Sequence, residues 1–320
     1  MNSISGAQLA AALLITDMFW LCCMRGSISA ASIAGVLAAS ALQFLMVLVY
    51  AVQERELSRG GAVFFLVYSL FWGGMIFAEF CDTSGITGIP VGNFMTAGLA
   101  ALVCLYISST GMKALGRAAV IAAAVGIALI ATDLLSAVFH ADWGDLSAPR
   151  SRGAWGELVR GFSVSGSLGS LAVFLGDVKG DRAKAAAGYF AARAVISAAV
   201  LLTALAVTGG IMELTEYPVI TAAQLSQPFE AQRIDSLFLV AFSVFAVFAA
   251  ALQIMTGARL LQQIFPRFGR WKSTAVTVLV IASVFFIGGR ELLLVRACAA
   301  AVALTAGAAG RKKAAAQSSG

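Results

Sequence analysis

Three carboxylic acids, Asp17, Glu79 and Asp133, interrupt long apolar stretches of this sequence. An acid at the centre of a membrane-spanning helix costs about 2.5–3.5 kcal/mol on insertion scales, so each one needs a partner or a wet cavity. Asp17 lies deepest in its stretch, where it can meet a substrate ammonium group or a proton, or hydrogen-bond to a neighbouring helix as a neutral carboxyl. Glu79 lies near one end of its stretch, where a solvated acid costs little. For Asp133, one turn from Ser136, we expect a structural hydrogen bond.

A second chemical signal is a run of glycine and serine from Gly161 to Ser170, which reads GFSVSGSLGS. Glycine weakens a helix by about 1 kcal/mol, and serine can satisfy backbone groups that unwinding frees. The run therefore predicts a broken helix whose free N–H groups would face a carboxylate. The alternative is a continuous helix that uses small residues for close packing. The candidate ligand shell is Thr16, Asp17, Ser163, Ser165, Gly166, Ser167 and Glu79.

Two arginines inside apolar stretches, Arg193 and Arg296, complete the buried charges. For Arg193 we expect an ion pair with an acid across the bundle; no role is assigned to Arg296. The only histidine, His140, is expected at the surface. The five cysteines show no CxxC spacing, and the glycine run lacks the Lys-Ser/Thr ending of a phosphate loop. We expect no enzyme activity, no metal and no cofactor.

Composition identifies the elements that must position these residues. Hydrophobic residues make up 60% of the chain, charged residues 12%, and the mean hydropathy is +0.90. A water-soluble fold would have too little polar surface, so we predict an all-α polytopic membrane protein. Continuous runs rather than short alternating segments indicate helices. The ten predicted spans are 8–24, 30–52, 62–80, 91–110, 114–139, 158–177, 186–209, 235–263, 272–288 and 290–308.

The number of spans suggests an internal repeat. Residues 1–320 form one transmembrane domain, in which pseudo-repeats 8–139 and 158–308 would be related by inversion, followed by a short tail, 309–320. Inverted-repeat transporters place their substrate near the bilayer midplane, where the first helix of each repeat is interrupted. The first span has no Gly or Pro around Thr16 and Asp17, so a break there has little support, and the sequence leaves open whether this helix is broken. A short external helix is predicted to start at Pro218 and to stop before Pro228.

The net charge of +6 is distributed as in a membrane protein. Lys and Arg concentrate at alternate connections, around 55–59, 113–117, 179–184, 259–272 and 311–313. The positive-inside rule then places both termini in the cytoplasm, and we expect no nucleic-acid partner. Because residues 1–8 contain no Lys or Arg, the first span is expected to be a retained helix and not a signal peptide.

Several segments resemble the endospore germination permease family, the B subunit of nutrient germinant receptors in the amino acid/polyamine/organocation superfamily. They are Tyr217 to Ile220, Gln232 to Phe238, the helix through Ala258 to Pro266, Ile4 to Leu9, Phe77 to Phe80 and Tyr106 to Arg117. The resemblance covers most of the chain.

The resemblance implies the ten-helix inverted-repeat fold, with a small nutrient, usually an amino acid, held between the first and sixth helices. It also implies assembly with a larger A subunit and a lipoprotein C subunit in the inner membrane of a spore. Family members usually carry Gly and Pro in the first helix, and this chain does not.

Three functions remain open on the sequence alone. The first is a nutrient-sensing subunit of a germinant receptor. The second is a proton- or sodium-coupled amino acid symporter, with Asp17 as the coupling carboxylate. The third is a scaffold whose ligand site has degenerated.

Overall fold

The computed structural model describes residues 4–52, 55–57, 59–86, 93–138, 153–209, 215–225, 235–287, 293–308 and 311–312. His140, Pro228 and most of the connection between the predicted pseudo-repeats lie outside these residues, as does the side chain of Asp133.

Each of the ten predicted spans corresponds to a helix or to a bent helix pair. Five helices are long and apolar enough to cross a membrane, one pair forms a bent span, and four further apolar helices have 10–17 residues within the described ranges. The spans are α1 (Gly6–Cys22), α2 (Ala30–Val52), α3 (Arg59–Ile86), α4 (Asn93–Thr110), α5 (Met112–Val138), the pair α6 (Ala154–Ser163) and α7 (Leu168–Phe174), α8 (Arg182–Thr208), α10 (Asp235–Ile264), α11 (Lys272–Ile287) and α12 (Leu293–Ala308). The chain is therefore an all-α integral membrane protein, as predicted.

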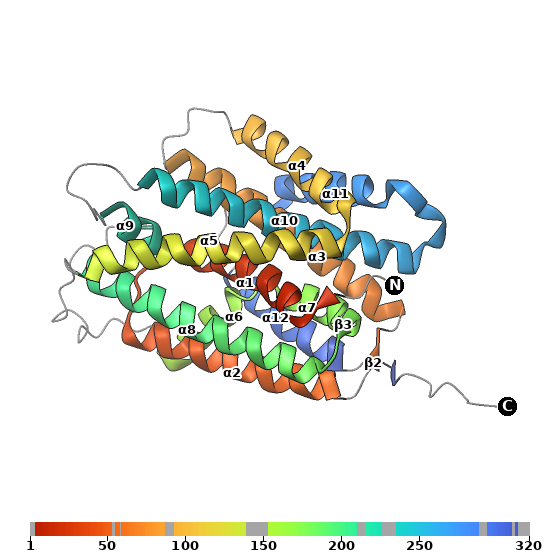
Figure 1. The fold of residues 1–320 in the computed structure, drawn as a ribbon, viewed down its shortest axis with the longest axis horizontal. Helices are drawn as coiled ribbons and strands as arrows, with labels where there is room; N and C mark the ends of the chain where they lie inside the picture. Colours follow the sequence, from red (N-terminus) through yellow and green to blue (C-terminus); the bar gives the residue numbers. More distant parts are fainter. Residues whose placement is uncertain are drawn as a thin grey trace.

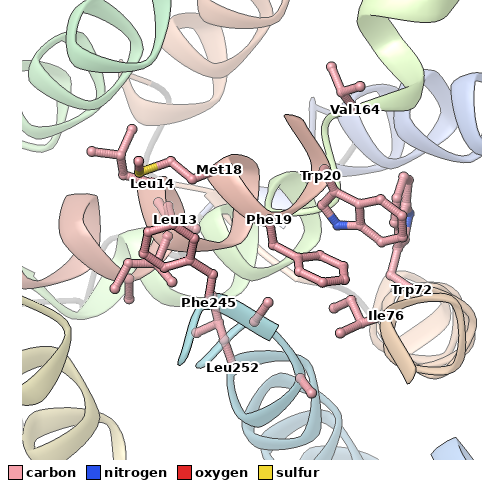
Figure 2. Packing of buried hydrophobic residues seen from close by; sticks show 14 of the residues in the cluster. Leu13, Leu14, Met18, Phe19, Trp20, Trp72, Ile76, Val164, Phe245 and Leu252 are labelled. Carbon is pink, nitrogen blue, oxygen red and sulfur yellow. The ribbon is translucent and has the colours of Figure 1, made fainter. Parts of the chain in front are cut away.

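Helix α1 lies at the centre of the bundle (Figure 1). Every residue from Ala12 to Cys22 is buried, as expected for a helix that is apolar on all sides. Its side chains pack on several neighbours at once: Figure 2 shows Leu13 near Phe245 of α10, and Trp20 beside Trp72 of α3. A capping box formed by Ser5 and Gln8 fixes its first turn.

Helix α1 is continuous through Thr16 and Asp17, a point that the sequence left open. The helix runs unbroken over 17 residues, or about 25 Å at 1.5 Å per residue. A coil from Cys23 to Ser29 then leads into α2. The predicted site therefore lies between an unbroken first helix, α1, and the Gly/Ser run of the sixth span.

The sixth span is broken where the Gly/Ser run predicts it. Helices α6 and α7 are bent by 52°, with Val164 to Ser167 outside either helix. The run is also used for close packing, because a Cβ added to Gly161 would lie 2.6 Å from the carbonyl oxygen of Gly35 on α2, and one added to Gly169 would lie 2.4 Å from the ring of Tyr68 on α3. The run thus serves both close packing and interruption.

Two short strand pairs join segments from distant parts of the chain at one end of the bundle. Strand β1 (Ile4–Ser5) pairs with β3 (Val178–Lys179), which follows the 3-10 turn η2 (Leu175–Asp177). Strand β2 (Arg55–Glu56) pairs with β4 (Arg311–Lys312). All four strands belong to the connections and termini that the charge pattern assigns to the cytoplasmic side. In the structure they lie together at one end of the bundle (Figure 1). Which side faces the cytoplasm stays a prediction.

The opposite end carries helix α9 (Pro218–Leu225) (Figure 1). It begins at Pro218, as predicted. It does not simply lie on the surface, because Pro218, Val219 and Ile220 are buried and the helix packs mainly against α8.

Candidate functional site

The break between α6 and α7 leaves backbone carbonyls that other helices satisfy. Tyr68 of α3 donates its hydroxyl to the carbonyl of Ser165 at 3.3 Å, and Gln253 of α10 donates its side-chain amide to the carbonyl of Gly166 at 2.9 Å. An interrupted helix is tolerated in a membrane when neighbouring side chains make such bonds. Side chains from α3 and α10 therefore stabilise the break.

Asp17 of α1 lies beside this break, where its carboxylate forms an ion pair and accepts a hydrogen bond. Its Oδ2 lies 3.4 Å from Nε of Arg193 on α8, and both side chains are almost fully buried, 5% and 2% exposed. The hydroxyl of Tyr189, also on α8, donates to the same Oδ2, and Ser167 lies 2.7 Å from that hydroxyl. The ion pair expected for Arg193 is confirmed, and its acid is Asp17.

Arg193 also connects α8 to α2 and to the break. Its guanidinium donates to Oε1 of Gln43 at 2.7 Å and to the hydroxyl of Ser165. Gln43 in turn donates its amide to Ser165 at 2.8 Å. The network of Asp17, Gln43, Ser165, Ser167, Tyr189 and Arg193, here called the inner network, thus ties three helices to the break.

Four buried polar atoms near the break have no hydrogen-bond partner among the described residues: Oδ1 of Asp17, Oε1 of Gln253 and the indole nitrogens of Trp20 and Trp72. The two indole rings meet edge to face with centroids 4.7 Å apart (Figure 2). Gly166 lies directly against them, since a Cβ there would be 2.2 Å from Nε1 of Trp20. Buried donors and acceptors are normally paired, so an unpaired set beside a helix break calls for an explanation.

Glu79 does not join the inner network. Glu79 lies toward the C-terminal end of α3. Its carboxylate accepts hydrogen bonds from Arg25 at 3.0 Å and from Tyr217 at 3.2 Å, and it also pairs with Arg296 of α12. The expectation of a solvated acid was wrong: Glu79 is only 4% exposed, because two arginines from distant segments cover it. We call Glu79, Arg25, Arg296 and Tyr217 the outer cluster.

The outer cluster also contains charges closer to solvent, and Trp20 links it to the break. Arg25 pairs with Asp82 at 3.1 Å and with Glu216 at 3.0 Å. Burial, followed by the charge of Glu79, raises the pKa of Tyr217, so its hydroxyl stays protonated and remains a donor. Arg296 stacks over the ring of Trp20 at 4.7 Å, which places the cluster directly beyond that indole.

The hydroxyl groups of two predicted ligand residues make hydrogen bonds within their own helices. The hydroxyl of Thr16 donates to the carbonyl of Ala12, and that of Ser163 donates to the carbonyl of Arg160. Arg160, the residue whose carbonyl accepts from Ser163, is buried and donates to the carbonyls of the coil after α1, including Gly26 at 2.8 Å.

Several residues of the site were not anticipated from the sequence. Gln43, Gln253 and Tyr189 are polar residues within apolar helices, a signal that could have drawn attention to them. Trp20 and Trp72 offered no comparable signal. Among the described residues, no group of three or more His, Cys, Asp or Glu could hold a metal ion.

Comparison with known proteins shows that the chain has the fold of solved transporter structures. No protein-family model matches the chain, and no curated protein matches it. The structure is similar to Mhp1, a nucleobase-cation-symport-1 family transporter, in a closed conformation with bromovinylhydantoin bound: the TM-score is 0.67 at 15% identity, over 95% of this chain and 76% of that one. For the inward-facing conformation of Mhp1, the TM-score is 0.61 at 16% identity, over 96% of this chain and 76% of that one. The chain shares the fold of a membrane transporter.

Proposed function

We propose that this protein binds a small nutrient, such as an amino acid, between α1 and the break of the sixth span. The observation that carries the proposal is the set of four unpaired buried polar atoms at Asp17, Trp20, Trp72 and Gln253. A ligand that supplies both donors and acceptors would complete their hydrogen bonds.

An amino acid zwitterion suits these groups chemically. Its ammonium group would donate to Oδ1 of Asp17 and Oε1 of Gln253, and its carboxylate would accept from the indole N–H groups of Trp20 and Trp72. Gly166, Ser165 and Ser167 would form the floor of the site, with Thr16 and Ser163 supporting it. Because Gly166 packs directly on both indoles, the described conformation is closed, and the rings must separate for a ligand to enter.

We further propose that binding is used for sensing. The resemblance to germination permeases supports a receptor subunit that works with A and C subunits in a spore membrane. In such a subunit the nutrient biases the bundle between two conformations, because it binds one of them better, and the partners respond to that shift. The outer cluster lies between the site and the end that carries α9, and it is suited to close the site on that side.

The test replaces the floor of the site. In spores, Gly166→Leu combined with Ser165→Leu should abolish the nutrient response while the protein remains in the membrane. Gly188→Ala is the matched control, because a Cβ at position 188 meets nothing within 4 Å. Unchanged nutrient sensitivity in the double variant would sink the site assignment.

The second candidate is an amino acid symporter, and it is supported by the fold shared with Mhp1, whose family name denotes cation symport. In this case Asp17 would be the coupling carboxylate. The guanidinium of Arg193 already supplies a positive charge beside Asp17, so a coupling proton or sodium ion would have to compete with Arg193 for this carboxylate.

Uptake separates the two candidates. Labelled amino acids are offered to proteoliposomes with and without an imposed proton or sodium gradient. A symporter accumulates its substrate with the gradient and loses coupling in Asp17→Asn. A sensor binds without accumulation, and a scaffold with a degenerate site shows no ligand effect at all.

A further inference from the structure

A cavity of about 830 Å³ lies away from the inner network, between the ends of α4, α10 and α11. It is bordered by the turn from α4 to α5 at Gly111 and by the 3-10 segment η4 (Pro266–Trp271) that precedes α11. Its volume is within the range of pockets that hold small organic molecules. The helix ends that border the cavity lie at the end of the bundle that carries the strand pairs and the basic connections (Figure 1).

The polar side of this cavity carries uncompensated positive charge. Arg259 is neutralised by Asp177, with Nη2 at 3.0 Å from Oδ1. Lys272 donates instead to the neutral amide of Gln262, and the described residues include no acid within ion-pairing distance of it. Lys113 follows directly after Met112, and Arg117 lies about one turn further along α5; both are exposed and lie near the lining without being part of it. An anion in the cavity would therefore meet a positive field.

Two hydroxyls beside Lys272 are also available. Ser273 and Thr274 line the cavity, and in the described structure neither side chain makes a hydrogen bond. Together with the ammonium group of Lys272, they offer three donor groups to a phosphate group.

The opening of the cavity faces the surroundings of the bundle through apolar side chains. Leu102, which lines it, is 65% exposed. Tyr106 and Trp271 are each 73% exposed, and such aromatic residues are typical of the level where the hydrocarbon meets the headgroups. An occupant can thus enter from the bilayer and keep an apolar portion outside the protein.

We propose that this cavity binds an anionic phospholipid. The phosphate lies against Lys272, Ser273 and Thr274, and an acyl chain follows Leu102 and Met255 toward the membrane interior. Basic pockets between transmembrane helices at the cytoplasmic side are suited to such headgroups. The site is separate from the nutrient site and does not depend on it.

The experiment measures retained lipid by native mass spectrometry. The full-length protein is purified in a mild detergent and incubated with phosphatidylglycerol or phosphatidylcholine. Lys272→Gln should lower phosphatidylglycerol retention about fivefold, the factor expected for one basic residue near an anionic lipid, and leave phosphatidylcholine retention unchanged. The matched control is Lys184→Gln, which removes an exposed lysine at the same end of the bundle, on α8.

A second variant fills the cavity without changing charge. Ser109→Trp places a large side chain at an exposed position of the lining and should reduce phosphatidylglycerol retention to a similar extent, with the thermal midpoint unchanged. Equal retention of the two lipids by the wild type would overturn the proposal, as would full retention in a folded Lys272→Gln or Ser109→Trp variant. Complete displacement of the lipid by soluble glycerol phosphate would assign the site to a soluble phosphate instead.

Discussion

Removing the guanidinium of Arg193 should destabilise the protein strongly, because that group neutralises Asp17 inside the bundle. In Arg193→Met, the Asp17 carboxylate loses its partner at 3.4 Å, and Gln43 loses its donor at 2.7 Å. Breaking a buried ion pair by removing one partner costs about 3–5 kcal/mol, since an uncompensated charge remains. We therefore expect a loss of about 3–5 kcal/mol in the free energy of unfolding.

Removing both charges should cost less than removing one. In Asp17→Leu/Arg193→Met no buried charge is left, and apolar replacement of a buried ion pair is often close to neutral. The hydroxyl of Tyr189 and the polar groups of Gln43 and Ser165 still lose partners, so recovery is expected to be partial. The loss in the double variant should be at least about 1 kcal/mol smaller than the sum of the two single losses, a coupling within the usual range for contacting residues.

The assay is equilibrium unfolding of the purified protein in mixed micelles with an increasing fraction of a denaturing detergent. Arg267→Met is the control, because Arg267 is exposed and lies in the connection before α11. Two results would refute the reasoning: an Arg193→Met loss no larger than that of Arg267→Met, or strict additivity of the single losses in the double variant.

Two further predictions concern the outer cluster and the helix packing. Glu79→Gln removes the acid that holds Arg25 and Arg296, so thiol labelling of the buried Cys23, followed by mass spectrometry, should become several times faster; an unchanged rate would show that the cluster does not close that end. Gly161→Leu should lower stability by at least about 1–3 kcal/mol, because its Cβ would lie 2.6 Å from a backbone oxygen on α2, whereas Gly188→Ala should change stability by less than about 1 kcal/mol; equal effects in the two variants would rule out the packing argument.

Much of the fold could be predicted because lipid imposes a simple rule on helices. A run of about 20 apolar residues spans the hydrocarbon core, so length and composition are enough to locate the spans. The break at Val164 to Ser167 was also predictable, since Gly and Ser together weaken a helix and satisfy the groups that unwinding frees. The same reasoning gave little support to a break around Asp17, which has no Gly or Pro near it, but only the structure shows that α1 is continuous. The inverted relation between the two halves stays a prediction.

The site was only partly predictable. Asp17 and Arg193 attract attention because a charge in an apolar span needs a reason. This argument predicts an acid partner for Arg193, but only the structure identifies that acid as Asp17. Their uncharged partners could not be assigned, because Tyr189 is 172 positions from Asp17 and only the packing of α1 against α8 brings them together. Glu79 shows the same limit: its exposure was misjudged because the two arginines that cover it come from distant segments.

The most direct test of the central claim is a fluorescence titration of the purified protein with a panel of amino acids, because Trp20 and Trp72 line the proposed site. We predict a saturable change in tryptophan emission with at least one amino acid. The change should persist in Trp271→Phe, whose indole is exposed, and disappear in Gly166→Leu. A folded protein whose emission responds to no amino acid, or a response that survives in Gly166→Leu, would contradict an amino acid site at the break.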